Sequence, residues 1–428
     1  GSFDPAFLEL PREVLIATMQ DHQKYFPVID DTENLLPVFV AVSNIDSKSP
    51  DVVRNGNERV IRPRLNDAAF FLKRDGEQPL SAHIEGLKQV VFQQALGSLH
   101  DKTQRVIKLA ANIAGHIGID PAMAIRAGEL SKCDLSTEMV GEFPELQGVM
   151  GRYYAQRDGE PEEVATALDE QYMPRFAGDR LPQTKTGQIL SIADKLDTLT
   201  GVFAIGQAPT GDKDPFALRR SALGTLRIMI ECGLDLDLEE LLEIAAAEFD
   251  GSVNASQVTV NLFDFMMERL RRYYLDRGIN IHVFESVLAL RPASPLDFHH
   301  RILAVTEFCK LPEADSLTTA NKRIGNILKK ADLRINESVD KHLLKEQAEQ
   351  QLAAAVDDVG SRVVHMLEKK DYENALTELA GLRDSVDQFF DDVMVMCDDE
   401  SLKNNRLALL RDLSDLFMQT ADISRLQG

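Results

Sequence analysis

The chain has 428 residues, of which 44% are hydrophobic and 6% aromatic, and its formal net charge is −22 at pH 7. This length and hydrophobic content suggest about three folded domains and exclude bulk disorder, while the few aromatic residues favour helical packing over a β-sandwich. The excess of acidic residues argues against non-specific binding to DNA or RNA, so any nucleic-acid binding needs a local basic face.

Hydrophobic periodicity predicts a mainly α, multi-domain chain with four parts. We expect a small α/β region at 1–78, a helical domain at 79–232, a helical connector at 233–312 and a last helical domain at 313–428. These boundaries follow shifts in composition and clusters of Gly and Pro.

Strand character is confined to the first region. A short helix is expected from about Pro11 to Met19, and two β-prone runs separated by a turn-rich segment predict a hairpin at 24–28 and 36–42. Further along, Asn66 and Asp67 can cap a new helix that carries two phenylalanines.

The region at 79–232 carries apolar stripes of helical period. The helices that we expect there cover 106–117, 122–132, 161–172, 186–199 and 215–232. Loops rich in Gly and Pro interrupt them at 141–151, 176–182 and 206–214. The connector contains a further helix at 262–274 and closes at a proline cluster at 292–295.

This middle region is similar to an HD-type helical domain, in which a His, a His-Asp pair and a distal Asp bind a divalent metal. Asp194 fills the distal position and Asp134 the second half of the pair, but Cys133 replaces the paired histidine and Lys102 occupies the first position. Two of the four ligands remain, and an ammonium group would repel a cation. We therefore expect a degenerate pocket without metal, filled by an ion-pair network of Lys102, Asp134 and Asp194. An active metal-dependent phosphohydrolase is the alternative.

No motif for a nucleophile or a nucleotide is present, since G-x-S-x-G, the P-loop and G-x-G-x-x-G are all absent. The tetrapeptide at 116–119 resembles a HIGH motif in letters only, because it ends a helix. His299 and His300 would point about 100° apart on a helix, which makes them poor co-ligands, and we expect both at the surface. We predict no catalytic residue and no cofactor in this chain.

The four cysteines contain no CxxC pair, which predicts reduced thiols and neither a disulfide framework nor a zinc site. No apolar run reaches the roughly 18 residues of a membrane span, and no signal peptide is visible. We therefore expect a cytoplasmic protein with no membrane partner.

A flexible turn leads into a helix at 211–220. Asp214 suits the N-cap and Pro215 the first helical position. Three cations lie close to this helix start: Lys213, Arg219 and Arg220. Two interpretations stay open, a loop that enters a helix packed on the core, and a contact of these cations with a phosphate or a subunit.

The spacing of apolar residues at 318–332 predicts an amphipathic helix in the last domain. Its apolar stripe for the bundle contains Ile324, Ile327, Leu328 and Ala331. The opposite face is basic and holds one amide able to read a base edge: Lys322, Arg323, Asn326, Lys329 and Lys330. An RNA-binding face and an ordinary solvated cationic face are the two interpretations.

Several ordered segments across the chain are together similar to the beta subunit of the heterotetrameric bacterial glycine–tRNA ligases (glycyl-tRNA synthetases). They lie at 23–28, 62–65, 67–71, 131–135, 147–151, 193–195, 213–220, 389–395, 405–407 and 421–423. Each segment alone is weakly specific, and their order and coverage carry the resemblance.

The resemblance implies an aminoacyl-tRNA synthetase subunit that binds tRNA(Gly) and docks a catalytic alpha subunit. ATP and Mg²⁺ would bind to the alpha subunit, which activates glycine, and no DNA partner is implied. The last domain would resemble the anticodon-binding domain of arginine–tRNA ligases. Because a full beta subunit begins further upstream, we expect this chain to lack its N-terminal part. A helical protein-interaction scaffold without RNA is the remaining alternative.

Overall fold

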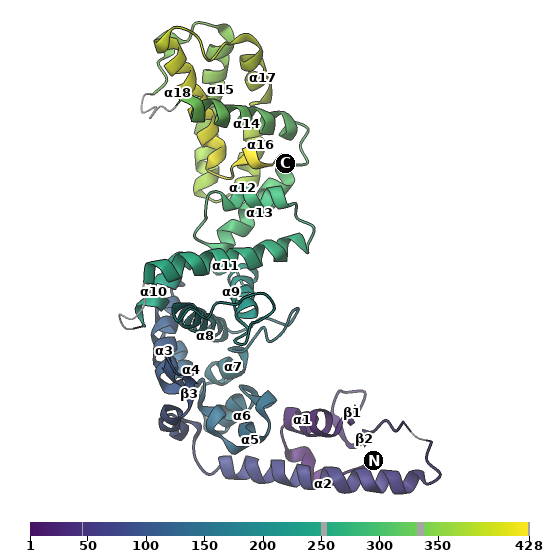
Figure 1. Cartoon of the computed structure of the whole chain (residues 1–428). Helices are drawn as coiled ribbons and strands as arrows, with labels where there is room; N and C mark the ends of the chain where they lie inside the picture. The colour runs from purple at the N-terminus through teal and green to yellow at the C-terminus, as the bar shows by residue number, and fades with distance from the viewer. Residues whose placement is uncertain (45, 250–254, 332–337, 427–428) are drawn as a thin grey trace. The chain divides into compact units, whose positions relative to one another are not determined.

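Helices form most of this computed structural model, which describes residues 1–44, 46–249, 255–331 and 338–426 (Figure 1). The chain divides into two compact units, residues 1–228 with 240–262 and residues 229–239 with 263–428. The four-part division expected from the sequence is a finer scheme and stays a prediction. None of the helices in the described ranges combines the length and the apolar character needed to cross a bilayer.

The first unit opens with a helix and a hairpin: α1 (Arg12–Gln23), β1 (Phe26–Ile29) and β2 (Leu35–Val40). The strands pair antiparallel with Phe26 opposite Val40, and the Tyr25 ring stacks on Phe39 with 4.6 Å between centroids. The hairpin expected from the β-prone runs is confirmed, and α1 continues past its expected end at Met19.

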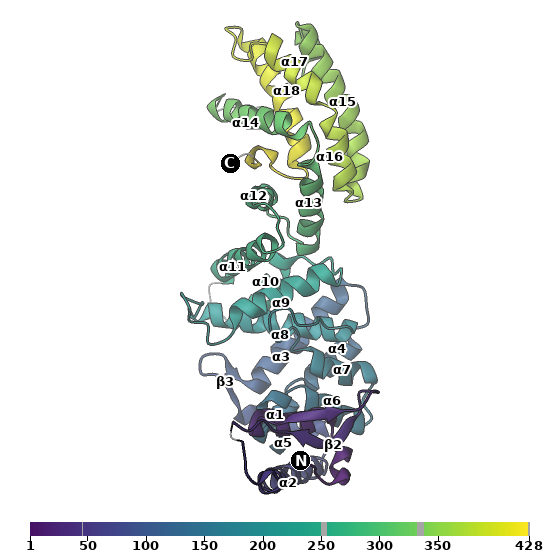
Figure 2. The ribbon, with the colours of Figure 1, turned by 90° about the vertical axis from the view of Figure 1, so that its right-hand side faces the viewer.

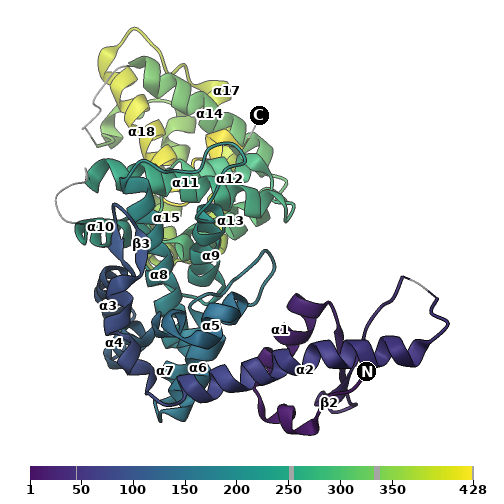
Figure 3. The same cartoon turned by 60° about the horizontal axis from the view of Figure 1, so that its bottom comes forward.

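A single long helix, α2 (Pro50–Asp75), follows the hairpin and lies beside α1 (Figure 3). Pro50 stands in the first turn of α2, where a backbone N–H would have no acceptor within the helix. The lack of an N–H in proline therefore costs no hydrogen bond there. The buried face of α2 continues without a break through Ile61, Leu65 and Ala68. The new helix start expected at Asn66 and Asp67 is therefore wrong, and both residues lie exposed inside α2.

A small second hairpin joins β3 (Val91–Gln93) to β4 (Gly97–Ser98). A capping box between Ser98 and Asp101 then starts α3 (Leu99–His116), about two turns before the expected start. The next helices are α4 (Ala122–Leu130), α5 (Glu138–Glu142), α6 (Val149–Arg157), α7 (Glu162–Glu170), α8 (Lys185–Ala204), α9 (Leu218–Glu231) and α10 (Leu238–Ala247). The expected helices of this region are confirmed apart from shifted ends. Helix α8 packs against α3, α4 and α7 and is buried along most of its length.

The regular secondary structure in the described part of the second unit consists of helices (Figure 2). Helix α11 (Ala255–Leu275) begins in the first unit and ends in the second, whose other helices are α12 (Ile281–Leu288), α13 (Pro295–Phe308), α14 (Ala314–Ala331), α15 (Gln347–Glu368), α16 (Tyr372–Ala380), α17 (Arg383–Asp392) and α18 (Glu400–Met418). Helix α14 packs on α17 and α18, and α15 packs on α16, α17 and α18.

A buried ion pair ties α15 to α18 in this bundle. Arg406 donates through Nε to the fully buried carboxylate of Glu349, and through Nη1 to the carbonyl of Met394 at 2.8 Å. The other oxygen of Glu349 accepts the amides of Lys345 and Glu346 at 2.6 and 3.1 Å. Because both ions are hydrogen-bonded to each other and to the backbone, the pair fixes the register of the two helices without leaving a bare buried charge.

Candidate functional site

The residue expected at the first ligand position of an HD-type site is a buried lysine. Lys102 lies on the apolar face of α3 and its side chain is 3% exposed. Its Nζ lies 3.1 Å from Asp194 Oδ1 and 3.0 Å from Asp197 Oδ2, and donates to Thr198 Oγ1 at 2.8 Å. Burial acts to lower the pKa of Lys102, but the two carboxylates outweigh it and raise that pKa above its ordinary value. A stable cation therefore stands where a metal ligand would be needed.

Asp194 on α8 is the common partner of two lysines. Its Oδ1 lies 3.1 Å from Nζ of Lys102 and 3.1 Å from Nζ of Lys132. Burial acts to raise the pKa of Asp194, but the nearby ammonium groups of Lys102 and Lys132 outweigh it and hold that pKa well below its usual range. The structure thus brings Lys102 and Asp194 together, and it adds Lys132, which the sequence analysis did not single out.

Asp134 stands outside this network, so the expected three-member arrangement is wrong at that residue. Its Oδ2 accepts the backbone amides of Gly148 and Gly151 at 2.5 and 3.2 Å. Gly148 has a φ of 81°, and a Cβ there would approach the Tyr172 ring to 2.6 Å, so only glycine lets the loop wrap around the carboxylate. Burial raises the pKa of Asp134 to about 6 although both amides and Lys132 act to lower it.

Cys133, at the position where an HD-type site would have its paired histidine, cannot supply the chemistry of that histidine. The side chain is fully buried and its Sγ contacts the carbonyl of Glu129 at 3.6 Å. Burial raises the pKa of this thiol to about 12. At neutral pH the residue is therefore a small apolar group that offers neither a thiolate ligand nor a nucleophile.

Lys195, next to Asp194, is a second buried lysine that the sequence analysis did not single out. Its Nζ donates to the carbonyls of Gln171 and Met173 at 3.0 and 2.8 Å and to Ser191 Oγ at 2.7 Å. Burial lowers the pKa of Lys195 to about 7, although Asp194 acts to raise it. The only signal in the sequence is the Ser at i−4, which a helix places beside this side chain.

The residues around Asp194 do not fit a divalent metal. Lys102 and Lys132 pair with its carboxylate, and the ammonium group of Lys195 is a third buried one on which Asp194 acts. Within the described ranges, no three His, Cys, Asp or Glu residues lie together in a way that could hold a metal ion. Ammonium groups are donors and cannot be ligands while protonated.

The basic residues expected on the terminal helix share one exposed face of α14. Lys322, Arg323, Asn326, Lys329 and Lys330 are all exposed, while Ile324 beneath them is fully buried and Ile327 and Leu328 are half-buried. The pattern of burial thus agrees with the amphipathic helix read from the sequence. Arg323 differs from its neighbours because its guanidinium lies over the Phe390 ring of α17, 4.3 Å from the centroid.

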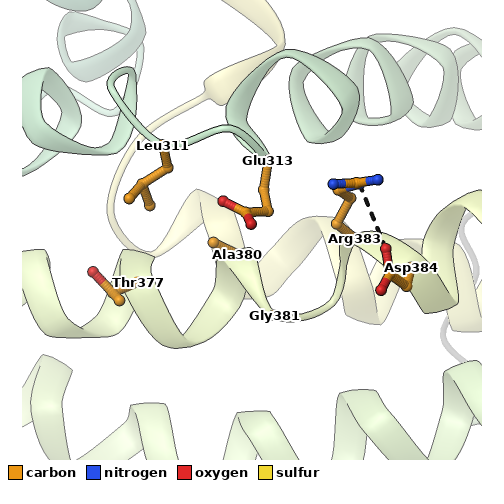
Figure 4. Close-up of a pocket in the computed structure, with 7 residues that line it drawn as sticks. All are labelled: Leu311, Glu313, Thr377, Ala380, Gly381, Arg383 and Asp384. Carbon is orange, nitrogen blue, oxygen red and sulfur yellow. Dashed lines mark ion pairs between the residues drawn. The ribbon is translucent and has the colours of Figure 1, made fainter.

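Two hollows lie in this domain, and the first borders the basic face at Arg323. One, of about 540 Å³, is lined by Asp315, Ser316, Thr319, Ala320, Arg323, Asp387, Phe390 and Asp391. The other, of about 320 Å³, lies between the loop before α14 and the α16–α17 turn, where Glu313 faces Ala380 and Gly381 (Figure 4). Arg383 separates them, since its Nε lies 3.5 Å from Asp384 in one and 3.5 Å from Asp387 in the other.

The loop at 211–220 is held by its own side chains. Asp214 accepts the amides of Leu218 and Arg219 at 2.8 and 3.0 Å, so it caps the helix as expected. The first helical residue, however, is Leu218 and not Pro215, because Ala217 adopts a φ of 53° and delays the start. Arg219 donates to the carbonyl of Gly211, and Arg220 to that of Arg175. Lys213 is exposed. These contacts agree with a structural role for the two arginines.

The histidine pair is not uniformly at the surface. His300 is exposed, whereas His299 is half-buried, stacks on Tyr274 and shares a 2.8 Å hydrogen bond with its hydroxyl. Burial, with a contribution from His300, lowers the pKa of His299. The expectation of a surface position was therefore wrong for His299, because the aromatic cluster of α11 and α12 covers it.

Comparison with known proteins gives two family matches. Residues 1–289 match the model described as glycyl-tRNA synthetase beta subunit, and residues 317–423 match that of the DALR anticodon binding domain. A glycine–tRNA ligase beta subunit of Hahella chejuensis is 52% identical over 429 residues, and one of Tolumonas auensis is 53% identical over 427 residues. Each alignment covers 100% of this chain and 62% of the relative, so the chain spans less than two thirds of their length.

We expect Asp194→Ala to destabilise the first unit, because Lys102 and Lys132 then lose their shared carboxylate. The cost should be about 1–3 kcal/mol, since Lys102 keeps Asp197 at 3.0 Å and Lys132 can release its proton instead of staying charged and unpaired. Hydrogen exchange of the α8 amides measures it. Asp212→Ala, which removes an exposed loop carboxylate, is the matched control. Equal exchange in the two variants would show that the Asp194 pairs contribute nothing.

A second prediction concerns pH. The folded-state pKa of Lys195 is about 7, below the unfolded value, so between pH 7 and 10 the unfolded chain binds more protons at this residue and its destabilising effect shrinks as pH rises. Lys195→Met removes this titration. The stability of Lys195→Met relative to the parent should therefore fall as pH is raised from 7 to 9, as measured by urea unfolding. A difference that is constant across this range would contradict a depressed pKa.

Proposed function

The chain belongs to the family of glycyl-tRNA synthetase beta subunits, and we propose that it binds a glycine tRNA through its last domain while it docks the catalytic alpha subunit. The exposed basic face of α14 carries this proposal, because it lies within the part that matches an anticodon-binding domain. On a chain with a net charge of −22, a local cationic face is what phosphate binding needs.

We assign separate roles to the residues of this face. Lys322, Lys329 and Lys330 would contact phosphates, which position an RNA without reading its sequence. Asn326 lies between them on the helix and carries an amide that can read a base edge. Together they would hold one strand of the anticodon arm along α14.

The alpha subunit would supply the chemistry. The names of the relatives, which are beta subunits, imply such a partner, and this chain carries no recognisable nucleotide-binding motif. ATP and Mg²⁺ would accordingly bind to the alpha subunit, and tRNA charging places the complex in the cytoplasm. Lys213, exposed on its loop, would be available to a phosphate or to that subunit.

The lysine-filled pocket fits an HD-type domain that has become structural. In this proposal α3, α4 and α8 keep the helical framework, while Lys102, Lys132 and Asp194 replace metal binding by ion pairing. The region would then have a structural role in the complex.

The basic face can be tested by single substitutions. Lys322→Ala, Lys329→Ala and Lys330→Ala should each weaken binding of the full chain to all tRNAs about equally. Each lost phosphate contact should also flatten the log–log dependence of affinity on salt by roughly 0.7 to 0.9. Fluorescence anisotropy at several salt concentrations measures both effects.

Three further variants make this test specific. Lys369→Ala removes an exposed lysine of the same domain outside this face and should change neither quantity. Asn326→Ala should narrow the gap between glycine tRNA and other tRNAs without changing the salt slope. Ile324→Ala should lower stability by about 2–5 kcal/mol through a core cavity. If all three lysine variants bind tRNA like the parent, the face is merely solvated and a protein scaffold is favoured.

The phosphohydrolase alternative has its own test. We expect the purified chain, supplied with Mn²⁺ and ATP, to release no more phosphate than Asp194→Ala does, because lysines occupy the positions of the ligands. Metal analysis should find less than one equivalent of Mn, Fe or Zn per chain. A stoichiometric bound metal together with phosphate release that depends on Asp194 would overturn the structural role of the pocket.

A further inference from the structure

A stripe of exposed residues runs along the solvent side of α2, the long helix of the first unit (Figure 3). Its positions recur every three or four residues, which places them on one side of a helix. The buried residues of α2, among them Ile61, Leu65 and Ala68, lie on another side. The stripe combines three cations and two amides with two apolar side chains, all exposed: Val52, Asn55, Arg59, Arg62, Asn66, Phe70 and Lys73.

The cations of α2 are either paired or unpaired, and the division follows the faces of the helix. The three that lie off the stripe each have a carboxylate at 3.0 or 3.1 Å: Arg54 with Asp51, Arg64 with Glu142 and Arg74 with Glu138. Arg59, Arg62 and Lys73 lie on the stripe, and none of them forms an ion pair or a side-chain hydrogen bond with a residue that the structure describes. The stripe therefore gathers the charges of α2 that the fold itself does not use.

These charges form a local cationic surface on an acidic chain. The whole chain has a net charge of −22, whereas the stripe contains no carboxylate. Asp51 and Glu58 beside it are engaged in an ion pair and in hydrogen bonds, and Asp67 is rotated about 100° from the neighbouring Asn66. Because salt screens exposed charges beyond about 8 Å, a polyanion on the stripe would interact mainly with its cations.

The shape and the chemistry of the stripe fit the backbone of paired RNA. An α-helix rises about 1.5 Å per residue, so the cations from Arg59 to Lys73 extend over roughly 21 Å of its axis. The side of one helix is convex and cannot enclose an unpaired base, but it can lie along a stem. Arginine and lysine contact phosphates, and the amides of Asn55 and Asn66 can bond to phosphate oxygens and to 2′-hydroxyl groups.

We propose that the stripe of α2 binds the sugar–phosphate backbone of a base-paired stem of the tRNA, outside the anticodon arm. The proposal rests on the proposed function, because it adds a second contact for the RNA whose anticodon arm is assigned to α14 in the other unit. Arg59, Arg62 and Lys73 would contact phosphates, which position an RNA without reading its sequence. The stripe would thus add affinity for every tRNA and leave discrimination between tRNAs to the last domain.

The test uses the full chain and two labelled RNAs, a whole glycine tRNA transcript and a hairpin made of its acceptor stem alone. Arg59→Gln, Arg62→Gln and Lys73→Gln should each weaken binding of the hairpin about fivefold, the order of one exposed charge contact. Each should also flatten the log–log dependence of affinity on salt by roughly 0.7 to 0.9. Fluorescence anisotropy at several salt concentrations measures both quantities.

Two controls make the test specific to this face. Arg54→Gln removes an exposed arginine of the same helix that lies off the stripe and pairs with Asp51, and it should change neither quantity. Lys330→Ala on α14 should weaken binding of the whole tRNA and leave binding of the acceptor-stem hairpin unchanged. The substituted residues are all exposed, so each variant should unfold at the temperature of the parent.

The outcomes separate this inference from the function on which it rests. If Arg59→Gln and Arg62→Gln bind the hairpin like Arg54→Gln, or if the parent does not bind it, the inference is overturned, while an effect of Lys330→Ala on whole tRNA keeps the proposed function. If the stripe variants bind both RNAs like the parent but no longer retain the alpha subunit in a pull-down, the stripe is a protein interface and the inference is again overturned. If the parent binds neither RNA, the proposed function fails and the inference fails with it.

Discussion

One oxygen of Asp194 holds two buried ammonium groups, and the packing of the first unit depends on that arrangement. Lys102 comes from α3, Lys132 from the segment after α4, and Asp194 from α8. Burying any one of these charges alone would be strongly unfavourable. Three separate pieces of backbone must therefore meet at one point, and α8 becomes the axis around which the neighbouring helices pack.

The second unit also contains buried charges that need a partner, and it contains exposed charges that do not. Glu349 and Arg406 are paired inside the bundle, so they fix helix positions and are unavailable to a ligand. The lysines of α14 have no such partners among the described residues and stay in solvent, where their charge can act on an RNA. The structural cations and the proposed RNA-binding cations of this chain thus differ in burial and pairing, and residue type alone does not reveal the difference.

Local signals in the sequence predicted much of the fold. The β-prone runs at 24–28 and 36–42 gave the hairpin, and the apolar stripe around Ile324 gave the exposed face of α14. Features that depend on contacts between residues far apart in the sequence were predicted less well. Asn66 and Asp67 are good caps in isolation, but the continuous buried face of α2 overrides them.

The site was predictable only in part for the same reason. Lys102 and Asp194 could be paired from a family pattern, whereas Lys132 and Lys195 look like ordinary surface lysines in the sequence. Asp134 was misplaced because its partners are backbone amides, which any sequence possesses and which only the turn at Gly148 directs toward it. Similarly, the contact between Arg323 and Phe390 joins residues far apart in the chain.

The ion pairs of Asp194 with Lys102 and Lys132 also limit which substitutions their neighbours tolerate. A single substitution of Cys133 by histidine would crowd a fully buried position, and the lysines beside Asp194 would remain in place. Replacing Lys102 alone would leave Asp197 to Arg105 and unbalance Asp194. Either change would therefore disturb the charge balance around Asp194 without supplying a complete set of metal ligands.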